Sequence, residues 1–258
     1  MTNNLPIGLF DSGVGGTSIW REIATLMPAE DTIYLADSKN APYGERSKEE
    51  IIALSIKNTE YLLDQNCKII VVACNTATTN AIKELRSRYD IPFIGIEPAL
   101  KPAVNSSATQ TIGVLATKGT LSSELFNKAV ESYRSTRIIE QIGHGLVPLI
   151  ESGKINSVEM TELLQKYLQP MINENIDYLV LGCSHYPYLI PQIQNILPPQ
   201  VKVIDSGQAV ARQTKNVLLE KCGFADRDIG SHHFLINAEP TVLSNLLQNK
   251  YEVVQSNF

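Results

Sequence analysis

The 258-residue sequence lacks both long apolar runs and concentrations of positive charge. None of its apolar runs approaches the ~20 residues that a membrane span requires. The first residues, MTNNLPIGLFDSG, lack the basic start and the long apolar stretch of a signal peptide. Lysine and arginine are scattered and the formal net charge is −5, which disfavours nucleic acids and acidic lipid surfaces as partners. We therefore expect a cytoplasmic protein that binds neither nucleic acid nor membrane.

Cysteine and histidine are scarce, with four of each, and they form no metal-binding pattern. There is no C-x-x-C, and no histidine lies at metal-ligand spacing near a pair of cysteines. No lysine stands in a setting that suggests a pyridoxal Schiff base. The sequence therefore predicts no metal and no organic cofactor. A lone cysteine in a reducing compartment is usually a small buried hydrophobe, and we interpret Cys67 and Cys222 in this way. We expect no special role for His144, His232 or His233.

What the sequence does contain is a regular alternation of apolar runs with amphipathic stretches. A capping box at Ser47 and Glu50 predicts the start of one helix, and Ser157 offers another cap. The alternation predicts an α/β fold with a mainly parallel sheet, because the apolar runs would be covered on both faces. Strands are expected at 6–12, 32–37, 68–74, 91–97, 111–117, 136–142, 177–183 and 201–205, and further helices at about 119–133, 157–175 and 188–197. The proline-containing segment 97–104 is interpreted as a junction between two similar halves.

Two pairs of short motifs indicate a weak internal repeat. IIVVACNT (69–76) and YLVLGCSH (178–185) each consist of an apolar strand, a small residue, a cysteine and two polar residues. GLFDSG (8–13) is echoed in the same way by KVIDSG (202–207). The repeat predicts two α/β units that face one another, each with a cysteine at the end of a strand. Because ligands of open α/β sheets lie beyond the carboxyl ends of the strands, these ends are candidate sites.

Three loops carry residues suited to chemistry. In FDSGVGGTSIW (10–20) a dinucleotide-binding pattern is incomplete, since Ser18 replaces the third glycine and Asp11 would crowd a pyrophosphate. We interpret this loop as an anion-accepting turn in which backbone N–H groups and Ser12 suit a carboxylate. In NAPYGERS (40–47), Tyr43 lies in a turn set by the neighbouring proline and glycine. In GCSHYPYL (182–189), His185 follows a cysteine closely enough to favour its thiolate.

A pair of thiols on opposite walls of a cleft suits the inversion of a carbon centre. One base removes a proton from one face of the carbon, and the conjugate acid of the other returns a proton to the opposite face. A free thiol has a pKa of ~8.5, close enough to neutrality for both roles. Two alternatives remain open at this point. A Cys–His hydrolase or amidotransferase would need only one cysteine, and a non-catalytic amino-acid-binding protein would need neither.

The motifs GLFDSGVGGTS, APYGERS, VVACNTATT, PFIGIEPALKPA, IGVLATKGTL, LVPLIESG, LVLGCSHYPYL and VIDSG follow one another from residue 6 to about 207. In this order they resemble the glutamate racemases of the aspartate/glutamate racemase family. The resemblance implies cofactor-independent interconversion of L- and D-glutamate, an isomerase activity that supplies D-glutamate for peptidoglycan, cell wall biogenesis and cell shape. It also implies two similar α/β domains with the active site in the cleft between them. The first would comprise residues 1–97 and 207–258 and the second 98–206, and we expect a homodimer.

The resemblance further implies roles for individual residues. Cys74 and Cys183 would be the two catalytic acid/bases, with Asp11 supporting Cys74, and Glu151 and His185 supporting Cys183. The positions that match substrate-binding residues of the family are Asp11, Ser12, Tyr43, Gly44, Asn75, Thr76, Thr117, Ser184 and His185.

One departure from the family pattern is Ser184, where the family commonly has threonine. The hydroxyl is kept and a methyl group is lost, so we expect slightly looser binding without a change of reaction. Related aspartate racemases usually carry an acidic residue at the position of His185. This histidine and the APYG loop therefore favour glutamate as the substrate.

Overall fold

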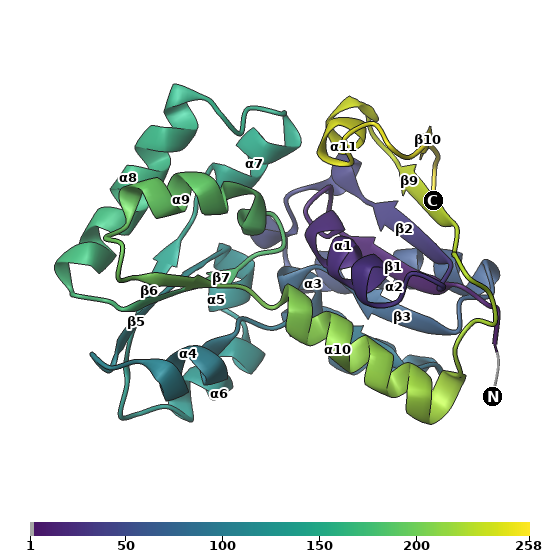
Figure 1. Ribbon diagram of the computed structural model, residues 1–258, viewed down its shortest axis with the longest axis horizontal. Coiled ribbons are helices and arrows are strands. Elements are labelled where there is room, and N and C mark those ends of the chain that lie inside the picture. The colour runs from purple at the N-terminus through teal and green to yellow at the C-terminus, as the bar shows by residue number, and fades with distance from the viewer. Residues whose placement is uncertain (1–2) are drawn as a thin grey trace.

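Two parallel β-sheets form the framework of the computed structural model, which describes residues 3–258. The larger sheet has the strand order β10-β9-β2-β1-β3-β4, and the smaller has the order β6-β5-β7-β8. Figure 1 shows the larger sheet on the right, with the C-terminal strands in yellow, and the smaller on the left in teal and green. The strands are β1 Ile7–Asp11, β2 Thr32–Ala36, β3 Ile69–Val72, β4 Phe93–Gly95, β5 Thr111–Ala116, β6 Arg137–Ile142, β7 Tyr178–Gly182, β8 Lys202–Ile204, β9 His232–Ile236 and β10 Val253–Gln255.

Helices connect nearly all of these strands. The α-helices are α1 Thr17–Leu26, α2 Lys48–Asp64, α3 Asn75–Arg88, α4 Leu100–Ser106, α5 Lys118–Leu121, α6 Glu124–Glu131, α7 Leu146–Glu151, α8 Val158–Asn173, α9 Ile190–Ile196, α10 Gly207–Val217 and α11 Thr241–Leu246. Short 3₁₀ helices lie at η1 Ser38–Asn40, η2 Tyr43–Glu45 and η3 Tyr186–Leu189, and a π-helical turn, η4, at Leu218–Cys222. Among the residues that the structure describes, no helix is long and apolar enough to span a membrane.

The larger sheet is buried on both faces because alternate residues of its strands point to opposite sides. Leu9 and Val71 belong to a core shared with α1 and α10, whereas Phe10 and Val72 belong to a core shared with α2 and α3. All four side chains are fully buried, and burial of each stabilises the fold by roughly 1.5–3 kcal/mol. This two-sided burial explains why the strands are near-continuous apolar runs.

The predicted α/β architecture is confirmed, as are the eight strands expected before residue 206. The capping box is present: the Ser47 hydroxyl accepts the Glu50 N–H and the Glu50 carboxylate accepts the Ser47 N–H. The proline-containing junction is helical from Leu100, with Pro102 in the first turn of α4, where a missing N–H removes no helical bond. Strands β9 and β10 were not predicted, and they return the end of the chain to the larger sheet beside β2. The domain boundaries at 97/98 and 206/207 stay a prediction.

The repeat is visible in the strand order, and one of its two sequence echoes is wrong. The order β2-β1-β3-β4 in the larger sheet has the same pattern as β6-β5-β7-β8 in the smaller. The cysteine-bearing strands β3 and β7 hold the same place in this pattern. GLFDSG lies on β1, however, whereas KVIDSG lies on β8, whose counterpart is β4. Their likeness is only that of a local turn, since Asp11 and Asp205 each accept the N–H two residues later.

Candidate active site

The pairing of the parallel strands brings the polar strand ends together. Phe10 pairs with Val72, so the next residues along, around Ser12 and Cys74, lie side by side. In the smaller sheet Ala116 pairs with Gly182, which brings the ends that precede Thr117 and Cys183 together in the same way. Each sheet therefore presents one thiol and a group of small polar side chains at its carboxyl edge.

A small cavity collects these side chains from both units. It is lined by Ser12, Pro42, Tyr43, Gly44, Cys74, Asn75, Thr76, Thr117, Val147, Cys183, Ser184 and His185. The structure thus brings together the predicted site residues, except that Asp11 and Glu151 lie behind the lining and bind Ser184 and His185. Its volume of about 10 Å³ is about that of a single water site. A cavity of this size does not hold an amino acid, so we infer that the two units separate to admit one.

Cys74 is held at the N-terminus of α3. Its Sγ accepts the Ala77 N–H at 3.4 Å and donates to the Ser12 Oγ at 3.6 Å. The side chain is buried, and burial raises the pKa of this thiol to about 12, with a further increase from the nearby Asp11 charge. In this environment Cys74 is therefore a neutral thiol. A cation placed beside it would lower the pKa of the thiol again.

Cys183 lies beside an imidazole that is itself paired with a carboxylate. Its Sγ is 3.8 Å from the His185 Nδ1, and the His185 Nε2 is 2.5 Å from the Glu151 Oε1. Burial would lower the pKa of His185, but its hydrogen bonds to Cys183 and Glu151 outweigh that effect and hold the pKa well above the usual value. The imidazole is therefore cationic at neutral pH, with the Glu151 carboxylate as its counter-ion.

Asp11 is fully buried at the end of β1, behind the cavity. Its two oxygens accept hydrogen bonds from the Gly13 N–H at 2.8 Å and the Ser184 hydroxyl at 2.7 Å. Burial raises the pKa of this carboxyl to about 6, against the opposing effects of the His185 charge and the Ser184 hydrogen bond. The charge of this carboxylate raises the pKa of Cys74. Its hydrogen bond to Ser184 links the two units.

The glycine-rich loop after β1 accepts an anion from the protein itself. The Val14 N–H donates to the Glu151 Oε1 at 2.7 Å across the cleft. A Cβ atom at Gly13 would lie 1.9 Å from this carboxylate oxygen, and one at Gly15 would lie 2.3 Å from the His185 ring. Glycine is needed at both positions because side chains of the second unit pack directly on the backbone. The predicted anion-accepting turn is thus filled by Glu151.

Sequence reasoning missed two residues that hold the site. Asp37, which directly follows β2, accepts a short hydrogen bond from the hydroxyl of Tyr43, a residue that lines the cavity. The next residue, Ser38, donates to the Glu151 Oε2 at 2.8 Å. Their position after an apolar strand, the same signal that selected Cys74, could have identified them.

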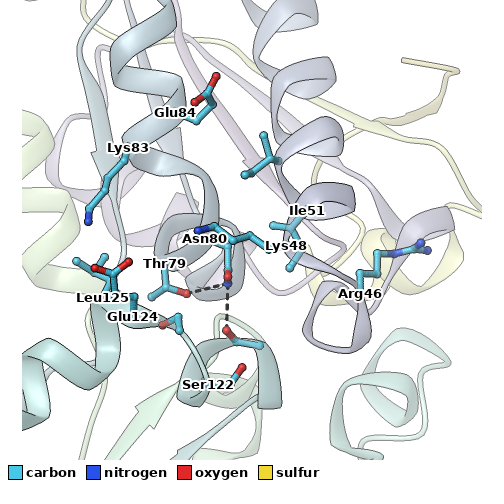
Figure 2. Close-up of a pocket in the computed structure, with 13 residues that line it drawn as sticks. Arg46, Lys48, Ile51, Thr79, Asn80, Lys83, Glu84, Ser122, Glu124 and Leu125 are labelled. Atoms are coloured by element: carbon cyan, nitrogen blue, oxygen red, sulfur yellow. Dashed lines mark hydrogen bonds between the residues drawn. The ribbon is translucent and has the colours of Figure 1, made fainter.

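A larger cavity lies between α2, α3 and the start of α6, as Figure 2 shows. It has a volume of about 470 Å³ and contains neither thiol. Its charged side chains carry both signs, and two of its acids pair with Arg88 and Lys128. Asn80, which lines this larger cavity, donates to the carbonyls of Thr76 and Gly119. We therefore take the thiol-lined cavity as the candidate active site. Within residues 3–258 no group of three or more His, Cys, Asp or Glu side chains could hold a metal ion.

The fold and this site define a class: a two-unit α/β enzyme with its reactive groups between the carboxyl ends of two parallel sheets. Comparison with known proteins names the family within that class. The family model described as Asp/Glu/Hydantoin racemase matches residues 7–214, and the chain belongs to this family.

Individual relatives agree with this assignment. The chain is 49% identical to a glutamate racemase of Ralstonia pickettii over 214 residues, which cover 83% of this chain and 76% of the relative. An Escherichia coli glutamate racemase structure in complex with L-glutamate and the activator UDP-MurNAc-ala superposes with a TM-score of 0.85 at 31% identity, covering 97% of both chains. A Francisella tularensis glutamate racemase in complex with D-glutamate has a TM-score of 0.84 at 28% identity, covering 98% of both. These relatives make the chain an isomerase of the racemase type.

Proposed function

We propose that the protein interconverts L- and D-glutamate without a cofactor, using Cys74 and Cys183 as the two proton carriers. The observation that carries this proposal is the presence of one thiol from each unit in a single small cavity. Solved relatives in complex with L-glutamate and with D-glutamate support the choice of substrate. We further propose that the product is D-glutamate for peptidoglycan, made in the cytoplasm, and that the enzyme is a homodimer.

The lining of the cavity suits an amino acid with two carboxylates. It contains no lysine or arginine, but Ser12, Thr76, Thr117 and Ser184 provide neutral hydroxyl groups. The Asn75 Oδ1 is a buried acceptor without a hydrogen-bond partner. An unsatisfied buried acceptor is costly, and the ammonium group of a bound amino acid would supply the missing donor. That ammonium would also lower the pKa of the neighbouring Cys74 thiol.

The two thiols would act in turn on opposite faces of the α-carbon. The thiolate of one cysteine accepts the α-proton, leaving the electron pair on a planar carbanion. The thiol of the other cysteine then donates its proton to the opposite face and becomes the thiolate. The Asp11 charge favours the thiol form of Cys74, whereas Cys183 has the cationic His185 as its neighbour. Closure of the cleft would exclude water from the carbanion.

The direct test is polarimetry with purified protein and L-glutamate, without added cofactor. We expect optical rotation to fall to zero as the two enantiomers reach equal amounts. In a parallel incubation with L-glutamine, release of ammonia and glutamate would instead favour the Cys–His hydrolase or amidotransferase alternative. Binding without turnover would favour a binding protein.

We predict a preference for glutamate over aspartate. The Cys183 loop carries His185, whereas aspartate racemases usually have an acidic residue at that position. The measurement is kcat/KM for both amino acids under the same conditions. Equal or better turnover of aspartate would mean that the substrate assignment is wrong.

We predict that His185→Asn lowers kcat unequally for the two directions. The two thiols have different neighbours, an imidazole 3.8 Å from Cys183 and a carboxylate charge near Cys74, so loss of the imidazole impairs one proton transfer more. The equilibrium constant between enantiomers is unity, so kcat/KM must stay equal in both directions and KM must change in compensation. Initial rates from both enantiomers over a range of concentrations test this. If kcat is unchanged in both directions, His185 has no role in proton transfer.

A further inference from the structure

The turn that follows β2 is held in place by the C-terminal segment. Asn237, just after β9, donates from its Nδ2 to the Asp37 Oδ1 at 2.5 Å, and its Oδ1 accepts the Lys39 N–H at 2.9 Å. Both Asn237 and Asp37 are buried. The Asn237 side-chain amide therefore forms hydrogen bonds with both residues that flank Ser38.

The same carboxylate makes the turn rigid from within. The Asp37 Oδ1 also accepts from the Asn40 Nδ2 at 2.8 Å, and the Oδ2 accepts from the Tyr43 hydroxyl. A buried carboxylate that accepts three hydrogen bonds resists movement, because loss of any donor would leave a charge poorly solvated. Asp37 thus ties the turn to the loop that lines the cavity.

Ser38 reaches from this rigid turn across the cleft to Glu151. The Glu151 Oε2 accepts the Ser38 hydroxyl at 2.8 Å, and the Oε1 accepts the Val14 N–H at 2.7 Å and lies 2.5 Å from the His185 Nε2. Two of the three groups that hold this carboxylate therefore belong to the first unit, although Glu151 and His185 belong to the second. The carboxylate is fully held only when the two units are closed.

We propose that Ser38 is a positioning residue for the Cys183 side of the reaction, and that Asn237 acts through it. The contacts run from Asn237 through the turn to Ser38, then to Glu151, His185 and finally Cys183. Closure of the cleft completes the set that orients the imidazole, so the second proton carrier becomes competent only around an enclosed substrate. This inference rests on the proposed function, in which Cys183 exchanges a proton with glutamate.

The test is Ser38→Ala, with L- and D-glutamate that carry deuterium at the α-carbon. Loss of a hydrogen bond to a charged group is expected to lower kcat/KM about tenfold, equally in both directions because the equilibrium constant is unity. Proton transfer at Cys183 becomes more rate-limiting. The deuterium isotope effect on kcat/KM should therefore rise for the enantiomer that gives its proton to Cys183, and fall for the enantiomer that gives its proton to Cys74. A general structural defect would change neither isotope effect.

Four further variants, one of them a control, make the result decisive. Cys183→Ala leaves only Cys74 as a base, so the enantiomer that still loses its α-deuterium to water identifies the direction. Ser38→Thr keeps the hydroxyl and should show the wild-type isotope effects. Asn237→Ala should behave like Ser38→Ala, with the isotope effect raised for one enantiomer and lowered for the other. Ser132→Ala is the matched control, since its exposed hydroxyl donates only to the Lys128 carbonyl of its own helix.

Thermal unfolding of each variant separates folding from kinetics. If Asn237→Ala does not fold, the isotope effects of Ser38→Ala decide alone. Isotope effects in Ser38→Ala that stay at wild-type values, or that move together, would overturn the proposal. Failure of the wild-type protein to racemise glutamate would instead refute the proposed function.

Discussion

Replacement of either Cys74 or Cys183 with alanine is expected to abolish racemisation. In the proposed mechanism each face of the α-carbon has one proton carrier, and both thiols line the same cavity. A positioned acid or base contributes typically ~10²–10⁴-fold to the rate. We therefore expect each single variant to lose at least about a hundredfold in kcat/KM, measured by polarimetry from both enantiomers.

The matched control for these variants is Cys222→Ala. Cys222 is a half-buried free cysteine in η4, and its Sγ donates to the Lys68 carbonyl far from the cavity. It should retain near-wild-type turnover. Near-wild-type activity in either Cys74→Ala or Cys183→Ala would contradict the two-base scheme and favour a reaction that uses one thiol.

Asp11→Asn is expected to stabilise the protein above pH 6 while it impairs the reaction. The pKa of Asp11 is about 6 in the folded protein, against about 3.9 in an unfolded chain. Between these pH values the folded state binds more protons than the unfolded state, so the stability of the wild type falls as pH rises. A shift of about two pKa units corresponds to about 3 kcal/mol. The neutral amide avoids this cost, because it buries no charge.

The measurement is the free energy of unfolding by urea at pH 3.5 and pH 8 for both proteins. The advantage of Asp11→Asn over the wild type should grow by about 3 kcal/mol between the two pH values, whereas its kcat/KM should fall by at least about tenfold. A constant difference between Asp11→Asn and the wild type would mean that Asp11 does not titrate as described.

Much of the framework follows from local patterns in the sequence. Runs such as 68–74 can only be strands covered on both faces, since their apolar side chains have no polar side to leave in water. The capping residues Ser47 and Ser157 identify two helix starts, and both caps are present. The recurrence of an apolar strand before Cys74 and Cys183 selected the two strand ends that meet in the cavity.

The C-terminal strands β9 and β10 were not predicted from the sequence, and the reason is physical. β9 has two histidines at its start, and β10 is short and largely exposed, so neither is an apolar run. Their place in the larger sheet comes from pairing with β2, a contact between residues about 200 positions apart. Such pairing leaves no periodic signal within either segment.

The sequence by itself determined the α/β class, most of the strands, the two thiols and, through its resemblance to glutamate racemases, the family. It could do so because side-chain periodicity, helix caps and strand-end motifs are local properties of the chain. Only the tertiary structure decided that Glu151 occupies the glycine-rich turn, that Ser38 reaches across the cleft to it and that Asn237 holds the turn from which Ser38 projects. These contacts join residues more than 100 positions apart, and those of Glu151 also depend on how two separate sheets close on each other.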